Sequence, residues 1–196
     1  STVDGKTVGA TSGPPVLDFS SPLLNSGLGY YRYYITRNDK IWGRLNESEK
    51  AFVKAHNKYW NNNNPGYKDP DHYQGQGGRS FKSNADRLAT WEGRQIRDFL
   101  TRHAPESLLE VGPGSGFYTR QIIECPTTRR YVATDINAGF LDYIKGAVGA
   151  HPGSAGIRTD FVEIEALDRL AESFDSIILL SALHHVPDRI DFVRAL

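Results

Sequence analysis

The chain has 196 residues, of which 39% are hydrophobic and 11% aromatic, so it can bury a core for one domain and an extension. Its 23 basic and 23 acidic residues give a formal charge of zero, so we expect no nucleic-acid partner, no membrane association and a small-molecule substrate. The single cysteine, Cys125, excludes an internal disulfide and a cysteine-based metal site, which favours a reducing, cytoplasmic location without a bound metal. No apolar run approaches the roughly 20 residues that span a bilayer.

Residues 1–82 are predicted to form an N-terminal arm and a mostly helical extension that could serve as a cap. Residues 1–26 are rich in Gly, Ser, Thr and Pro, which is typical of an arm or an ordered loop. The aromatic residues at 30–42 either pack this arm on the main domain, which is the simpler interpretation, or line a substrate site.

A helix is predicted after this arm. Asn46 and Glu49 have the spacing of a capping box, and the apolar residues at 52–60 share one helical face. The NNNNPG run at 61–66 should end the helix, and the loop at 67–78 could cover a pocket.

Residues 83–196 are predicted to form an α/β domain. A helix is expected from 83 to 103, with Asn84 as its cap and a broad apolar stripe that includes Leu88 and Trp91. Short apolar runs then alternate with helical segments, which predicts a doubly wound parallel sheet with right-handed crossovers. The four expected strands are 108–111, 131–136, 157–162 and 174–180.

A glycine-rich loop follows the first predicted strand. Residues 108–116 have the sequence LLEVGPGSG, and Phe117 can open the next helix. Glycine allows positive φ and close approach of a ligand, while a helix start offers free N–H groups, so a nucleotide-like ligand fits there. The dinucleotide fingerprint G-x-G-x-x-G would need its last glycine at Phe117, whereas it stands at Gly116. A nicotinamide-dependent oxidoreductase is therefore a disfavoured alternative.

Acidic residues accompany the next two predicted strands. Asp135 lies at the end of the second strand, where ligands bind in open α/β sheets. It can accept two ribose hydroxyls or, alternatively, cap the next helix. Asp160, followed by Phe161, is placed after the third strand, and taken alone it would be a solvated turn residue.

Two segments together resemble class I S-adenosylmethionine (SAM)-dependent methyltransferases of the small-molecule type. The E-x-G-x-G-x-G pattern that begins at Glu110 resembles their motif I, and FDSIILLSALHHVPD at 174–188 resembles their motif IV with its LHHVPD-type ending. The resemblance implies S-adenosyl-L-methionine as cofactor. It assigns the methionine end to Glu110, Gly112, Gly114 and Gly116, the ribose to Asp135, the adenine to Asp160 and Phe161, and the position below the sulfonium to Ser181. Ile136 is a further expected cofactor-binding residue.

His184 and His185 follow the fourth predicted strand and are candidates for a catalytic residue. A neutral imidazole has a pKa suited to a general base. Alternatively, both histidines pack or hydrogen-bond at a helix start. The chain has no Asn-Pro-Pro-Tyr motif of amino-methylating DNA enzymes, and Cys125 does not follow the fourth strand, so methylation of nucleobases is disfavoured. We expect O- or C-methylation of a small molecule, with N-methylation left open.

The resemblance implies seven strands, whereas the sequence reaches Leu196 after the fourth. We expect either a truncated chain, in keeping with the absence of methionine, or a sheet edge that is covered by another segment, a second copy or a partner. An alternative function is a SAM-binding or cofactor-free module that regulates or scaffolds a partner.

Overall fold

The computed structural model describes residues 42–64, 80–83, 89–186 and 188–196. No helix in these ranges is long and apolar enough to cross a membrane. Several expectations fall outside the described residues: the arm at 1–26, the aromatic residues at 30–35, the loop at 67–78, and Asn84 and Leu88 of the second predicted helix.

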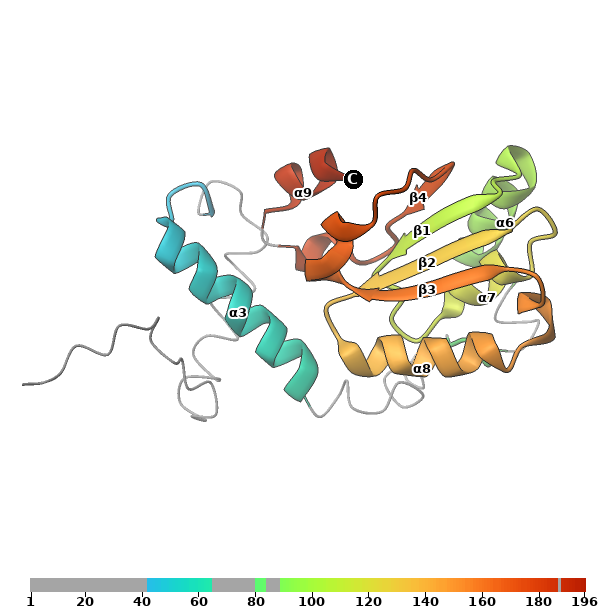
Figure 1. Cartoon of the computed structure of the whole chain (residues 1–196), viewed down its shortest axis with the longest axis horizontal. Helices are drawn as coiled ribbons and strands as arrows, with labels where there is room; N and C mark the ends of the chain where they lie inside the picture. The colour runs from blue at the N-terminus through green and yellow to red at the C-terminus, as the bar shows by residue number, and fades with distance from the viewer. Residues whose placement is uncertain (1–41, 65–79, 84–88, 187) are drawn as a thin grey trace, which may run out of the picture.

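Four parallel strands form a sheet in the order β3-β2-β1-β4 (Figure 1). They are β1 (Ser107–Val111), β2 (Arg130–Asp135), β3 (Arg158–Glu163) and β4 (Ser176–Ile178). The helices α7 (Phe117–Ile123) and α8 (Ala138–Gly149) connect β1 to β2 and β2 to β3. The predicted α/β class is therefore confirmed. β4 pairs with β1 and is an edge of the described sheet, and what covers this edge remains a prediction.

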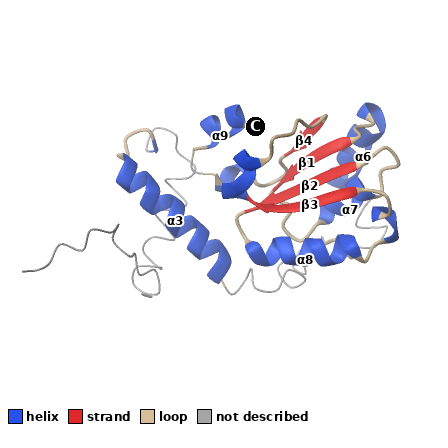
Figure 2. Ribbon diagram, in the orientation of Figure 1, coloured by secondary structure: helices blue, strands red, loops and turns tan. Residues whose placement is uncertain are grey.

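The two faces of the sheet pack against different elements, because successive strand residues point to opposite faces. The face that carries Leu108 and Tyr131 packs against α7, α8 and α6 (Trp91–His103). The face that carries Leu109 and Val132 packs against residues of the 3-10 helix η3 (Ile164–Arg169) and of α9 (Arg189–Ala195). Figure 2 shows α6, α7 and α8 beside the strands. A short 3-10 helix, η2 (Pro152–Ser154), precedes β3.

The second predicted helix begins later than expected. α6 starts at Trp91, with Thr90 as its N-cap, instead of near Ser83. The Ser83 Oγ accepts the N–H of Ser80 at 2.7 Å, and such local side-chain bonds offer the backbone an alternative to a helix. Trp91 is also 65% exposed, so it does not belong to the buried stripe of this helix.

The first predicted helix, α3 (Glu47–Asn63), begins at the expected capping box. The N–H of Glu49 donates to the side chain of Asn46, and the N–H of Asn46 donates to the side chain of Glu49, both at 2.9 Å. The helix then runs three residues further than predicted. The side chains of Asn61, Asn62 and Asn63 each donate to the carbonyl four residues earlier, so the asparagines are accommodated within the helix.

Candidate functional site

The loop between β1 and α7 has the backbone conformation that its glycines predict. Gly112, Gly114 and Gly116 have φ angles of 71°, 55° and 82°, in the left-handed region. A Cβ at Gly112 would lie 2.5 Å from the Cβ of Ala182, and a Cβ at Gly116 would overlap the side chain of Ile144. The first of these contacts brings the loop against the segment that follows β4. The loop therefore depends on glycine both for its conformation and for its packing.

Asp135 lies at the end of β2, beside this loop. Its side chain is buried, and it accepts the N–H of Asn137 at 2.8 Å and the N–H of Gly114 at 3.4 Å. Burial raises the pKa of Asp135 to about 6, although the backbone N–H groups act in the opposite direction. The carbonyl of the next residue, Ile136, accepts a bond from Asn62 of α3 at 2.9 Å. Because each carboxylate oxygen has two lone pairs, Asp135 can still accept hydroxyl groups of a ligand.

Glu110 is buried under the glycine loop. The hydroxyls of Tyr131 and Thr119 both donate to Glu110 Oε2, at 2.6 and 2.7 Å. Burial is the main cause that raises the pKa of Glu110 to about 7, and the nearby Asp135 adds to it. Tyr131 and Thr119 were not predicted as site residues. The available signal for Tyr131 was strand alternation, which places it on the same face of the sheet as Glu110.

The variant Glu110→Gln is expected to weaken the pH dependence of stability. Glu110 and Asp135 have raised pKa values, from 4.5 to about 7 and from 3.8 to about 6, so the folded chain binds more protons than the unfolded chain at intermediate pH. Their contribution to the free energy of unfolding is greatest below the unfolded pKa values and is lost as pH rises to about 7. Glutamine can still accept the two hydroxyl bonds but cannot ionise.

Urea unfolding at about pH 5 and about pH 7 measures this effect. The change in the free energy of unfolding between the two conditions should be smaller in Glu110→Gln than in the unaltered chain. An equal change in both proteins would contradict the raised pKa of Glu110.

Asp160 lies within β3 and not after it, because the strand continues to Glu163. This corrects the expected position of Asp160. It is paired in register with Val132, and its carboxylate forms an ion pair with Arg130 at 2.6 Å. Three residues separate it from the end of the strand, which is roughly 10 Å. The structure does not bring Asp160 to the end of β3, and its role toward adenine remains a prediction.

Phe161 also lies within β3, where it packs edge-on against Tyr131, with ring centroids 6.3 Å apart. Its side chain belongs to the core on the α7 and α8 face. The acid at the end of β3 is Glu163, which is in register with Asp135 and accepts a bond from Lys58 at 2.8 Å. Sequence reasoning missed Glu163, although the expected third strand ended at the residue immediately before it.

The segment after β4 forms a 3-10 turn, η4 (Leu183–His185), which contains both candidate histidines. Ser181 precedes this turn with a φ of 57°, an uncommon conformation for serine. His185 is half-buried, and its carbonyl accepts a bond from the Asn57 side chain at 3.3 Å. Ala182, between them, contacts the glycine loop. The structure thus brings the backbone of Ser181, His184 and His185 to the same end of the strands as Gly112.

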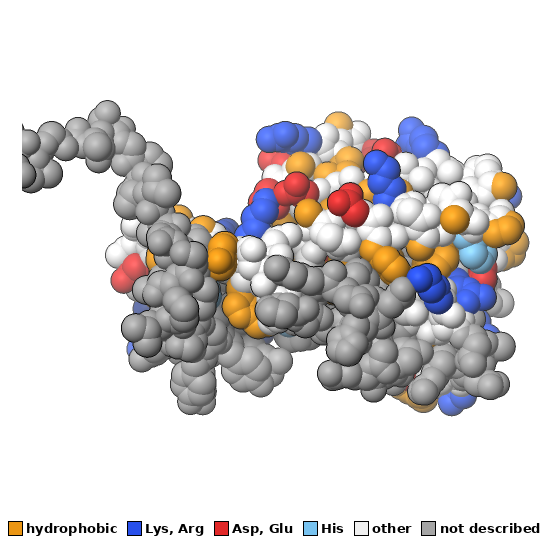
Figure 3. Space-filling model, turned by 90° about the horizontal axis from the view of Figure 1, so that it is seen from below, with side chains coloured by type: hydrophobic (Ala, Val, Ile, Leu, Met, Phe, Trp, Pro, Cys, Tyr) orange, Lys and Arg blue, Asp and Glu red, His pale blue; other side chains and the backbone are white. Residues whose placement is uncertain are grey.

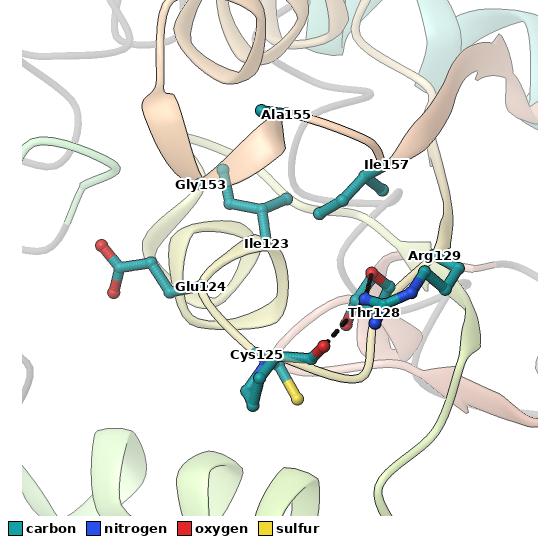
Figure 4. A pocket seen from close by; sticks show the side chains of 9 residues that line it. Ile123, Glu124, Cys125, Thr128, Arg129, Gly153, Ala155 and Ile157 are labelled. Atoms are coloured by element: carbon teal, nitrogen blue, oxygen red, sulfur yellow. Dashed lines mark hydrogen bonds between the residues drawn. The ribbon is translucent and has the colours of Figure 1, made fainter.

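A hollow of ≈ 340 Å³ lies at the end of the sheet opposite to the glycine loop, where β2 and β3 begin (Figure 4). Its walls come from the end of α7, the following turn and the segment before β3, and they include Cys125, Arg129 and Ile157. None of the predicted site residues lines this hollow. We therefore place the candidate site at the glycine loop.

Neither the surface charge nor the potential metal ligands of the described residues mark a further site. Figure 3 shows basic and acidic side chains mixed on one face of the described part of the molecule. Among the described residues, no group of three His, Cys, Asp or Glu side chains could hold a metal ion.

Comparison with known proteins supports one assignment. Residues 109–196 match the model of a family described as "Methyltransferase domain", and this region contains the glycine loop, Asp135 and the segment after β4. No curated protein and no solved structure matches the chain. The parallel sheet with its flanking helices and the family match together support a methyltransferase domain of class I type in the second half of the chain.

Proposed function

We propose that this chain is a SAM-dependent methyltransferase that acts on a small molecule, with O- or C-methylation favoured. The observation that carries the proposal is the convergence of the glycine loop with Asp135, since the N–H of Gly114 donates to the Asp135 carboxylate. Ligands of open α/β sheets bind where strands end and the strand order reverses. Here that position lies beside β1, whose neighbours are β2 and β4.

The residues at this position fit the cofactor. Gly112, Gly114 and Gly116 present backbone without side chains in the left-handed region, so a ligand can approach the loop closely. Asp135 has acceptor capacity for two ribose hydroxyls, and Glu110 lies buried beneath the loop, where its bonds to Tyr131 and Thr119 tie β1 to β2 and α7. Glu163 is the best-placed acid of β3 for the adenine amino group, ahead of Asp160. When bound, S-adenosylmethionine supplies an electrophilic methyl group on its sulfonium.

The other task of the protein is to orient the acceptor and remove its proton. We assign proton removal to the imidazole of His185, with His184 as the alternative, because both follow β4 on the side of the glycine loop. An imidazole nitrogen would accept the proton from a hydroxyl or an acidic carbon as the acceptor atom attacks. The bond from Asn57 holds the backbone of His185 in place for this role.

The experiment that tests this proposal measures formation of S-adenosylhomocysteine from S-adenosylmethionine. The full chain is incubated with a panel of phenols, carboxylic acids and carbon acids, with duplex DNA as the control acceptor. We expect turnover with at least one small acceptor and none with DNA. Cofactor binding without turnover across the panel would favour the alternative, a SAM-binding regulatory module.

A further inference from the structure

Helix α3 lies across the ends of three strands, although it belongs to the part of the chain that precedes the sheet (Figure 1). Lys54 pairs with Asp188 after β4 at 2.7 Å. Lys58 pairs with Glu163 at 2.8 Å and with Glu165 at 3.1 Å, at and after the end of β3. These ion pairs are largely exposed, and exposed pairs contribute little to stability. They indicate where α3 lies but do not explain what holds it there.

The asparagines at the end of α3 make closer contact with the segment after β2. The Asn62 side chain donates to the carbonyl of Ile136 at 2.9 Å and accepts the N–H of Ala138 at 3.0 Å. The carbonyl of Asn61 accepts a bond from the Asn137 side chain at 2.6 Å. Three consecutive residues of this segment are therefore bonded to α3.

This segment is the one that shapes the surroundings of Asp135. The N–H of Asn137 donates to Asp135 at 2.8 Å, and the Asn137 side chain caps α8 by accepting the N–H of Phe140. Asn137 is 4% exposed, so its bonds with α3 are shielded from water. A shift of the segment would therefore move a donor away from the Asp135 carboxylate.

We propose that Asn62, supported by Asn61, is a positioning residue that fixes the segment after β2 and so presents Asp135 to the ribose. This inference rests on the proposed function for the ligand, but the fixation of the segment concerns the chain alone. α3 is then a structural part of the cofactor site and not only an extension beside it.

The three successive asparagines offer a matched pair of variants. Asn62→Ala and Asn63→Ala each remove one side-chain bond to the helix carbonyl four residues earlier. Asn62→Ala also removes the two bonds to Ile136 and Ala138, whereas Asn63 is exposed. Thermal unfolding checks that both variants still fold.

Hydrogen exchange of the amides at 136–140 in the ligand-free chain is the first measurement. We expect Asn62→Ala to speed this exchange roughly tenfold relative to Asn63→Ala, since two local bonds are lost. Equal exchange in the two variants would overturn the proposal. If the unaltered chain binds no S-adenosylhomocysteine, the proposed function fails, and this comparison still decides whether Asn62 fixes the segment.

Affinity for S-adenosylhomocysteine is the second measurement. Asn62→Ala should bind about fivefold more weakly than the unaltered chain, while Asn63→Ala should stay within about twofold. The effect of Asn62→Ala should disappear when Asp135→Ala is already present, because Asn62 acts through Asp135. An undiminished effect in the Asp135→Ala background would contradict the positioning role.

Discussion

Replacement of Gly112 with alanine is expected to reduce affinity for S-adenosylhomocysteine at least tenfold and to destabilise the chain by roughly 1–3 kcal/mol. Two costs add at this position. The φ of 71° disfavours any residue with a side chain, and the new Cβ would lie 2.5 Å from the Cβ of Ala182. Relief of this overlap would displace the glycine loop, at which the cofactor is proposed to bind.

Gly156→Ala is the matched control for this variant. Gly156 has a φ of 84°, but a Cβ there would meet nothing within 4 Å. It should show only the cost of the left-handed conformation, roughly 1 kcal/mol, and unchanged affinity. Thermal unfolding and calorimetric titration of both variants make the comparison. If Gly112→Ala matched Gly156→Ala in both stability and affinity, the overlap with Ala182 and the role of the loop in binding would be contradicted.

Asp135→Ala is expected to lower affinity for S-adenosylhomocysteine more than tenfold, which corresponds to about 1.4 kcal/mol or more. The reason is the loss of a carboxylate that would accept ribose hydroxyls, since bonds to charged groups are the stronger ones. The chain should stay folded, because the alanine would fit the space of the carboxylate and α8 would retain its Asn137 cap. Circular dichroism checks the fold, and calorimetry measures the affinity.

Asp160→Ala is the control for Asp135→Ala, because it removes an acid of the sheet that lies away from the proposed site. This acid lies within β3 and pairs with Arg130, so its removal should leave affinity within about twofold. Unchanged affinity in Asp135→Ala would remove Asp135 from the site. A loss in Asp160→Ala as large as that in Asp135→Ala would return the adenine contact to Asp160.

Much of the fold could be predicted because its signals are local. The apolar runs of β1 and β2, the glycines between them and the capping box at Asn46 each lie within a few residues, and each is confirmed. Errors arose where local signals compete. The start of α6 was misplaced because the serines at 80 and 83 form a turn, and α3 was predicted too short because asparagines usually favour turns.

Within the candidate site, only residues in the glycine loop or at the end of a strand could be predicted from the sequence. The position of Asp135 at the end of β2 could be predicted from the strand pattern, whereas Asp160 was placed after the third strand although the expected strand at 157–162 already contained it. The contact between Asn62 and Ile136 joins residues 74 positions apart and leaves no periodic pattern in the sequence. Such contacts depend on how α3 packs on the sheet, which sequence patterns do not specify.

The most direct test of the central claim is calorimetric titration of the full chain with S-adenosylmethionine and S-adenosylhomocysteine, with NADH as the control ligand. The proposed cofactor site predicts micromolar binding of both SAM compounds and no binding of NADH. Binding of NADH without either SAM compound would contradict the assignment of the glycine loop and support a nicotinamide site instead.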